Sequence, residues 1–185
     1  MKMTNKTAFK HQAKTEKYGI EESKLMKLFE EELKDIYWAV KSLSKAMPKM
    51  IKNASSNELM EAIKNHQTET ESQIKKVEKI FEVMGRKAEA KKCLAMEGLI
   101  KEAEEIIKSS DKGAMRDAGI IAAIQKIKHY EIASYGTLRT FAQTLELTKS
   151  VSLLEEILEE EKRTDKKLTE IAESTINVMA MSEVD

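Results

Sequence analysis

The sequence predicts an all-α protein with four long helices and a shorter helix in the connection between the second and the third. Apolar residues recur at three- and four-residue steps over most of the chain, which is the spacing of one helix face. The composition agrees, because Ala, Leu, Ile, Met, Glu and Lys dominate while the 185 residues include one Pro and six Gly. Both observations favour helices over strands.

Length and charge limit the domain organisation and the partners. We expect one helical domain at residues 21–176, a flexible tail at 1–20 and a frayed end at 177–185. Acidic and basic residues balance at 32 each, which argues against nucleic-acid binding. No secretory signal or bilayer-spanning stretch is visible, and Cys93 is the only cysteine. We therefore expect a cytoplasmic protein with neither a nucleic-acid nor a membrane partner.

Capping and breaking residues set the limits of the first two long helices. The first is expected to begin near Glu21 and to kink at Pro48 before it ends. The second is expected to begin after Ser55, which with Glu58 fits a capping box. Gly85 suits the C-cap of this second helix.

The second half of the chain predicts a second helix pair. A shorter helix is expected over Ala88–Lys108, a third long helix over Ala114–Leu145, and a last one after Leu147–Thr148. Two helix pairs joined by one long crossover form the ferritin-like connection, which differs from a simple up-and-down bundle. The predicted fold is therefore a ferritin-like four-helix bundle whose long crossover contains the extra, shorter helix.

Polar residues that could bind a metal interrupt three of the four long apolar stripes about halfway along. The first stripe instead carries Val40 at the comparable point. Acids and imidazoles at one height inside a helical bundle are how di-metal centres are built. The interrupting residues are His66, Glu69 and Gln73 in the second helix, Lys128 and Glu131 in the third, and Glu161 and Asp165 in the fourth.

Each of these groups has a second interpretation. Glu161 and Asp165, one turn apart, are either two oxygen ligands or the edge of a solvated acidic face. His66 and Glu69 are three residues apart and either share a metal or form a surface pair. Glu131 binds a metal or forms an internal ion pair with Lys128, three residues earlier on the same face.

No competing catalytic pattern is present in the sequence. It contains no glycine-rich phosphate loop, no nucleophile elbow and no cysteine-rich zinc spacing. We interpret Cys93 as a small buried residue, because no activating base is indicated near it.

Several short motifs resemble the YciF-like ferritin-like stress proteins of bacteria. The likeness covers residues from about Glu22 to Ile176, with the motifs in the family order. The motifs are Lys91-Lys92-Cys93 followed by Ala95-Met96-Glu97-Gly98-Leu99-Ile100, then Arg116-Asp117-Ala118, His129-Tyr130-Glu131-Ile132-Ala133-Ser134-Tyr135-Gly136-Thr137-Leu138, and Glu160-Glu161-Lys162-Arg163-Thr164-Asp165.

The resemblance implies a rubrerythrin-like helical bundle, a tendency to form homodimers and an association with stress responses, without an established reaction. It also implies a carboxylate and histidine site for iron or another divalent metal. In this chain that site would be carried by His66, Glu69, His129, Glu131, Glu161 and Asp165.

The chain departs from the family pattern at three positions of that site. Val40 and Lys128 stand where acids are usual, and Gln73 stands where histidine is often found. Lost negative charge and a gained positive charge weaken cation binding. We therefore expect a stress-associated ferritin-like protein with a degenerate metal site that holds a divalent metal or none. The alternatives are a rubrerythrin-like di-iron oxidase or peroxidase, and a metal-free dimeric interaction module.

Overall fold

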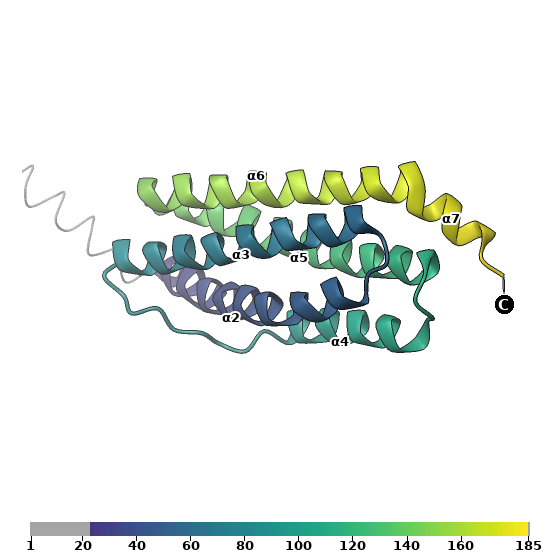
Figure 1. Cartoon of the computed structure of the whole chain (residues 1–185). Helices are drawn as coiled ribbons and strands as arrows, with labels where there is room; N and C mark the ends of the chain where they lie inside the picture. Colours follow the sequence, from purple (N-terminus) through teal and green to yellow (C-terminus); the bar gives the residue numbers. More distant parts are fainter. Residues whose placement is uncertain (1–22, 185) are drawn as a thin grey trace, which may run out of the picture.

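The computed structural model describes residues 23–184, and every regular element in this part of the chain is helical (Figure 1). The predicted flexible tail at 1–20 lies outside the described residues. The elements are α2 (Lys24–Asn53), α3 (Asn57–Val83), α4 (Leu94–Ser109), α5 (Ala114–Thr144), α6 (Thr148–Ile171), the π-helical turn η1 (Ala172–Ile176) and α7 (Asn177–Ser182).

Two helical hairpins pack side by side to form the bundle. Helices α2 and α3 form the first hairpin, α5 and α6 the second, and the hairpins meet through α3 against α6 and α2 against α5. A long crossover runs back along the bundle and carries α4, which packs against α2 and α5 (Figure 1). The predicted bundle with a helix in its crossover is confirmed.

The helix starts differ slightly from the prediction, and a serine hydroxyl is the N-cap of each of the first two long helices. Helix α2 begins at Lys24 rather than near Glu21, since the Ser23 hydroxyl accepts the Met26 N–H at 3.0 Å. Helix α3 is capped by Ser56, one residue after the predicted Ser55. Helix α2 also continues past Pro48 to Asn53.

The carboxylate of Asp117 on α5 explains the shift at the start of α3. It accepts the backbone N–H of Ser55 at 2.8 Å and that of Ser56 at 2.7 Å. Asp117 is buried, so these charge-assisted bonds tie the start of α3 to α5. The Ser55 backbone therefore binds another helix, and the next serine becomes the cap.

Helix α3 ends near Gly85, as predicted. Helix α4 begins at Leu94 and not at the predicted Ala88. Gly85 has a φ of 67°, and the following Arg86 N–H donates to the Phe81 carbonyl at 2.9 Å, which closes the helix. Residues 86–93 are not helical. Helix α4 begins at Leu94, where the Cys93 thiol accepts the Met96 N–H at 3.3 Å.

Residues 177–182, which the sequence predicted to be frayed, form helix α7. Beyond it, the Glu183 carboxylate accepts the N–H groups of Ala114 at 2.6 Å and Met115 at 3.0 Å. These are orphan donors at the start of α5, whose N-cap residue, Gly113, has no side chain to satisfy them. The prediction missed this contact because its two partners are 69 residues apart.

The apolar stripes of the long helices form one continuous core. Buried residues such as Phe29, Leu33, Ile63, Ile124 and Leu154 come from all four long helices. Burial of these side chains is the main stabilising contribution in such a bundle. Within residues 23–184, no helix combines the length and the apolar character needed to cross a membrane.

Candidate functional site: a lysine–carboxylate cluster in the bundle core

A layer of fully buried polar side chains crosses the middle of the bundle. The members lie on the inward stripes of their helices, so packing of the bundle forces them together. Helix α2 contributes Val40, which is also fully buried. The polar members are His66, Thr70 and Gln73 from α3, Lys128 and Glu131 from α5, and Glu161 from α6.

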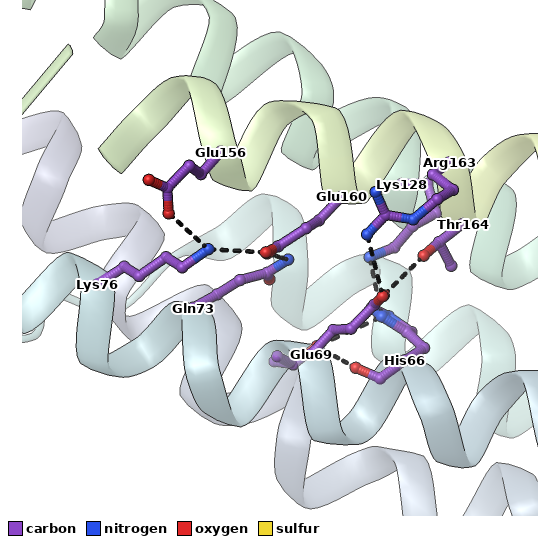
Figure 2. Close-up of polar contacts among 10 residues, drawn as sticks. His66, Glu69, Gln73, Lys76, Lys128, Glu156, Glu160, Arg163 and Thr164 are labelled. Atoms are coloured by element: carbon purple, nitrogen blue, oxygen red, sulfur yellow. Dashed lines mark hydrogen bonds and ion pairs between the residues drawn. The ribbon is translucent and has the colours of Figure 1, made fainter. Parts of the chain in front are cut away.

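Lys128 is the centre of this layer. Its side chain has no solvent exposure, and its ammonium contacts Glu161 Oε2 and lies 2.7 Å from Glu131 Oε2. The contact with Glu131 is an ion pair without the geometry of a hydrogen bond, since both oxygens of that carboxylate lack a hydrogen-bond partner. The ammonium also lies 3.4 Å from His66 Nδ1 (Figure 2). The Lys128 ammonium is therefore surrounded by acceptor atoms from α3, α5 and α6.

The charges of this cluster compensate one another. Burial alone would lower the pKa of Lys128, but the carboxylates of Glu131 and Glu161 raise it above its usual value. Burial, and then repulsion from Glu161, raises the pKa of Glu131 to about 8 against the attraction of Lys128. With this raised pKa, the Glu131 carboxyl retains its proton at neutral pH.

His66 is a neutral acceptor in this cluster. Burial and the Lys128 ammonium hold the pKa of its imidazole well below the usual 6.5. Since an ammonium only donates, Nδ1 accepts and the proton resides on Nε2. The Thr70 hydroxyl donates to the His66 carbonyl at 2.9 Å and so bonds to the adjoining turn of α3. The buried Nε2 has no protein partner.

The other predicted ligands of α3 and α6 lie outside this cluster. Glu69 is partly exposed, and its carboxylate accepts the Thr164 hydroxyl at 3.0 Å and contacts Arg163 at 3.3 Å. Figure 2 shows this link crossing from α3 to α6 in front of the buried Lys128–His66 contact. Glu69 therefore connects two helices at the surface and does not join His66 as a ligand.

His129 and Asp165 form a third, separate pair. The His129 side chain is 72% exposed, and its Nε2 lies 3.3 Å from Asp165 Oδ2. The other Asp165 oxygen accepts from the Gln125 amide at 3.3 Å. The quarter-turn between His129 and the inward stripe of α5 places it on the outside.

Sequence reasoning missed a neighbouring polar link between α3 and α6. The Gln73 amide donates to Glu160 at 3.2 Å, and the Lys76 ammonium lies 2.7 Å from Glu160 and 3.2 Å from Glu156 (Figure 2). Lys76 follows Gln73 by three residues, so the two side chains project from one face of α3. Glu160 lies in the acidic run Glu159-Glu160-Glu161, and the sequence alone does not show which of these acids contacts another helix.

A di-metal centre does not fit this arrangement. The six predicted ligands lie in three places, and only His66, Glu131 and Glu161 meet, around an ammonium. Within residues 23–184, no three His, Cys, Asp or Glu side chains are grouped so that they could hold a metal ion. Of the six ligands that the resemblance implies, the Lys128 ammonium therefore contacts Glu131, Glu161 and His66, and the other three have partners elsewhere.

Comparison with known proteins identifies the family. Residues 24–181 match the family described as "Domain of unknown function (DUF892)". The chain belongs to the DUF892 family. The chain is 47% identical to the protein YciF of Escherichia coli K12 over 149 residues, which are 80% of this chain and 90% of that protein. The predicted YciF-like resemblance is confirmed.

Solved structures of similar proteins support the same fold. The crystal structure of the Escherichia coli stress protein YciF matches with a TM-score of 0.80 and 45% identity, over 84% of this chain and 98% of that one. YcfI of Rhodopseudomonas palustris, named as a candidate structural protein, matches with a TM-score of 0.77 and 38% identity, over 80% and 94%. The DUF892 match at residues 24–181 thus includes all four long helices and α4.

Proposed function

We propose that this chain is a stress-associated structural protein whose helical bundle works without metal chemistry. The observation that carries the proposal is the distribution of the six predicted ligands over three places, each with partners from the chain itself. The names of the similar proteins, one a stress protein and one a candidate structural protein, support the same role.

We further propose that the chain works as a homodimer in the cytoplasm. Large apolar side chains are exposed near the start of α5 and along α7, where a second copy of the chain could cover them. These residues are Met115, Val178, Met179 and Met181. The single cysteine is compatible with a reducing compartment.

The rubrerythrin-like alternative requires two bridged irons with an open coordination position. A lysine ammonium lies among the three donors that converge, and two positively charged ions beside it would meet direct repulsion. The structural role is therefore better supported than the rubrerythrin-like activity.

Metal analysis after purification without chelators, repeated after aerobic iron loading, separates these functions. The structural proposal expects no retained iron, an unchanged Tm and no peroxide consumption. Two irons per chain together with peroxide turnover would establish the enzyme instead.

A cellular test addresses the structural role directly. The triple variant Lys128→Met, Glu131→Gln, Glu161→Gln removes the charges of the cluster and keeps the side-chain volumes similar. In a strain whose own copy is deleted, this variant should restore stress survival as well as the native chain does. If the folded variant fails to restore survival, the chemistry of the cluster is needed and the proposal is wrong.

A further inference from the structure

The C-terminal segment, residues 177–184, is anchored to the rest of the bundle through one carboxylate. It consists of α7 and the two residues that follow, packs against α5, and buries none of the α7 side chains (Figure 1). Within residues 23–184, the only hydrogen bonds that join this segment to α2, α3, α4 or α5 are those that Glu183 accepts. They come from the N–H groups of Ala114 at 2.6 Å and Met115 at 3.0 Å.

The start of α5 has room for this carboxylate and the polarity to hold it. The first N–H groups of the helix have no partner within it, and the dipole of a 31-residue helix favours an anion at this end. Gly113 provides no capping side chain, and a Cβ at that position would lie 2.5 Å from Glu183 Oε1. The glycine therefore leaves free the space that the carboxylate occupies.

The same segment closes a cavity of about 300 Å³ at this end of the bundle. The starts of α3 and α5 line one part of the cavity, including the buried Asp117 that holds the N–H groups before α3. Thr175 and Ile176 of η1 and Met179 and Glu183 of the segment line the rest. Movement of the segment away from α5 would therefore open the cavity to water beside Asp117.

We propose that residues 177–184 form a salt-sensitive latch, which Glu183 closes against the start of α5 and which a rise in ionic strength releases. The contact is electrostatic and Glu183 is exposed, so dissolved ions screen it. Apolar burial, which stabilises the bundle itself, is not screened by salt. The latch therefore opens while the bundle stays folded, and η1, which keeps Ala172 and Ile176 buried, is the hinge.

The native chain tests the latch through amide hydrogen exchange, measured by NMR at about 0.05 M and about 1 M NaCl. Exchange is expressed relative to unstructured peptides of the same sequence, which removes the effect of salt on the chemistry. We expect residues 177–184 and the N–H groups of Ala114 and Met115 to exchange about tenfold faster at the higher salt. The middle of α5 should keep its rates. Unchanged exchange of the segment and of those two N–H groups would overturn the proposal.

Glu183→Ala removes the anchor, and Glu173→Ala is its matched control. Without the carboxylate the latch is open at both salt concentrations, so exchange of residues 177–184 should be fast and independent of NaCl. Glu173 is an exposed glutamate of the adjoining η1, and its replacement should leave the native behaviour unchanged. If the Glu183→Ala chain responds to salt as strongly as the native chain, other contacts hold the segment and the latch is wrong.

Glu183→Gln separates charge from shape. The amide keeps one acceptor oxygen but carries no charge, so some protection of Ala114 and Met115 should remain at low salt while the response to NaCl disappears. A Glu183→Gln chain with the full salt response would contradict an electrostatic latch. The latch lies within a single chain, so these measurements do not depend on the homodimer proposed above, which the oligomeric state of the native chain tests separately.

Discussion

At the scale of single residues, Lys128 supplies the positive charge that the buried acids of the bundle core require. Its ammonium is the only positive charge among the fully buried side chains of residues 23–184. Lys128→Met keeps the length of the side chain but leaves buried acids without their counter-charge. We expect it to lower the free energy of unfolding by about 3–5 kcal/mol at neutral pH, as measured by urea titration.

The comparison for Lys128→Met is the triple variant that also carries Glu131→Gln and Glu161→Gln. Because it removes the acids with the lysine, it should recover most of the lost stability. Lys126→Met should change the free energy of unfolding by less than about 0.5 kcal/mol, since Lys126 is exposed. Equal losses for Lys126 and Lys128 would show that the buried cluster contributes nothing particular.

The raised pKa of Glu131 predicts how stability depends on pH. The folded chain holds a proton on this carboxyl up to a pKa of about 8, whereas the unfolded chain releases it near 4.5. Between these values the folded state binds more protons, so this contribution is complete at low pH and is lost as the pH rises toward 8. Glu131→Gln cannot titrate, so its free energy of unfolding should lack that decline. Parallel curves for the two proteins between about pH 5 and pH 9 would contradict the assignment.

At the scale of helices, two glycines should respond to alanine in opposite directions. Gly85 ends α3 with a φ of 67°, where a Cβ is disfavoured, while Gly98 lies inside α4 with open space around it. Gly85→Ala should lower the free energy of unfolding by about 1–2 kcal/mol. Gly98→Ala should raise it by about 0.5–1 kcal/mol, because alanine favours the helix. Denaturant titrations of both variants test the pair, and a loss at Gly98 would show that this position contacts something.

The link between α3 and α5 depends on one carboxylate. Asp117 accepts both N–H groups that precede α3, and it is buried. Asp117→Ala leaves those donors without their partner and should lower the free energy of unfolding by about 1–3 kcal/mol. The exposed Asp111 provides the control, since Asp111→Ala should have little effect. Faster amide exchange at the start of α3 in Asp117→Ala would locate the loss there.

At the scale of the whole molecule, the order and faces of the helices could be predicted because hydrophobic periodicity is a local property. The Glu161 stripe, the Gly85 cap and the crossover helix all follow from residues within a few turns. The Asp117 and Glu183 contacts could not be predicted, since their partners are distant in sequence and meet only after the bundle forms.

The candidate site was predictable in part for the same reason. The inward positions of His66, Glu131 and Glu161 follow from the helix stripes, and the ion pair with Lys128 follows from a three-residue spacing. The pairing of side chains across the bundle does not follow from the stripes. Glu69 pairs with Arg163 and His129 pairs with Asp165, because a rotation of each helix by a fraction of a turn moves a side chain from the core to the surface.

The reactivity of the thiol at the start of α4 should report on opening of the crossover segment. Cys93 is the only cysteine, is buried, and touches the Tyr130 hydroxyl of α5 at 3.1 Å, while that hydroxyl donates to Asp35 of α2 at 2.7 Å. Because Cys93 is buried, we expect a thiol reagent to reach it only after this segment opens. The rate of labelling of the native chain should therefore report how often this segment opens, and Tyr130→Phe should accelerate it. Opening of the crossover can then be timed separately from unfolding of the bundle, without introducing a cysteine by mutation.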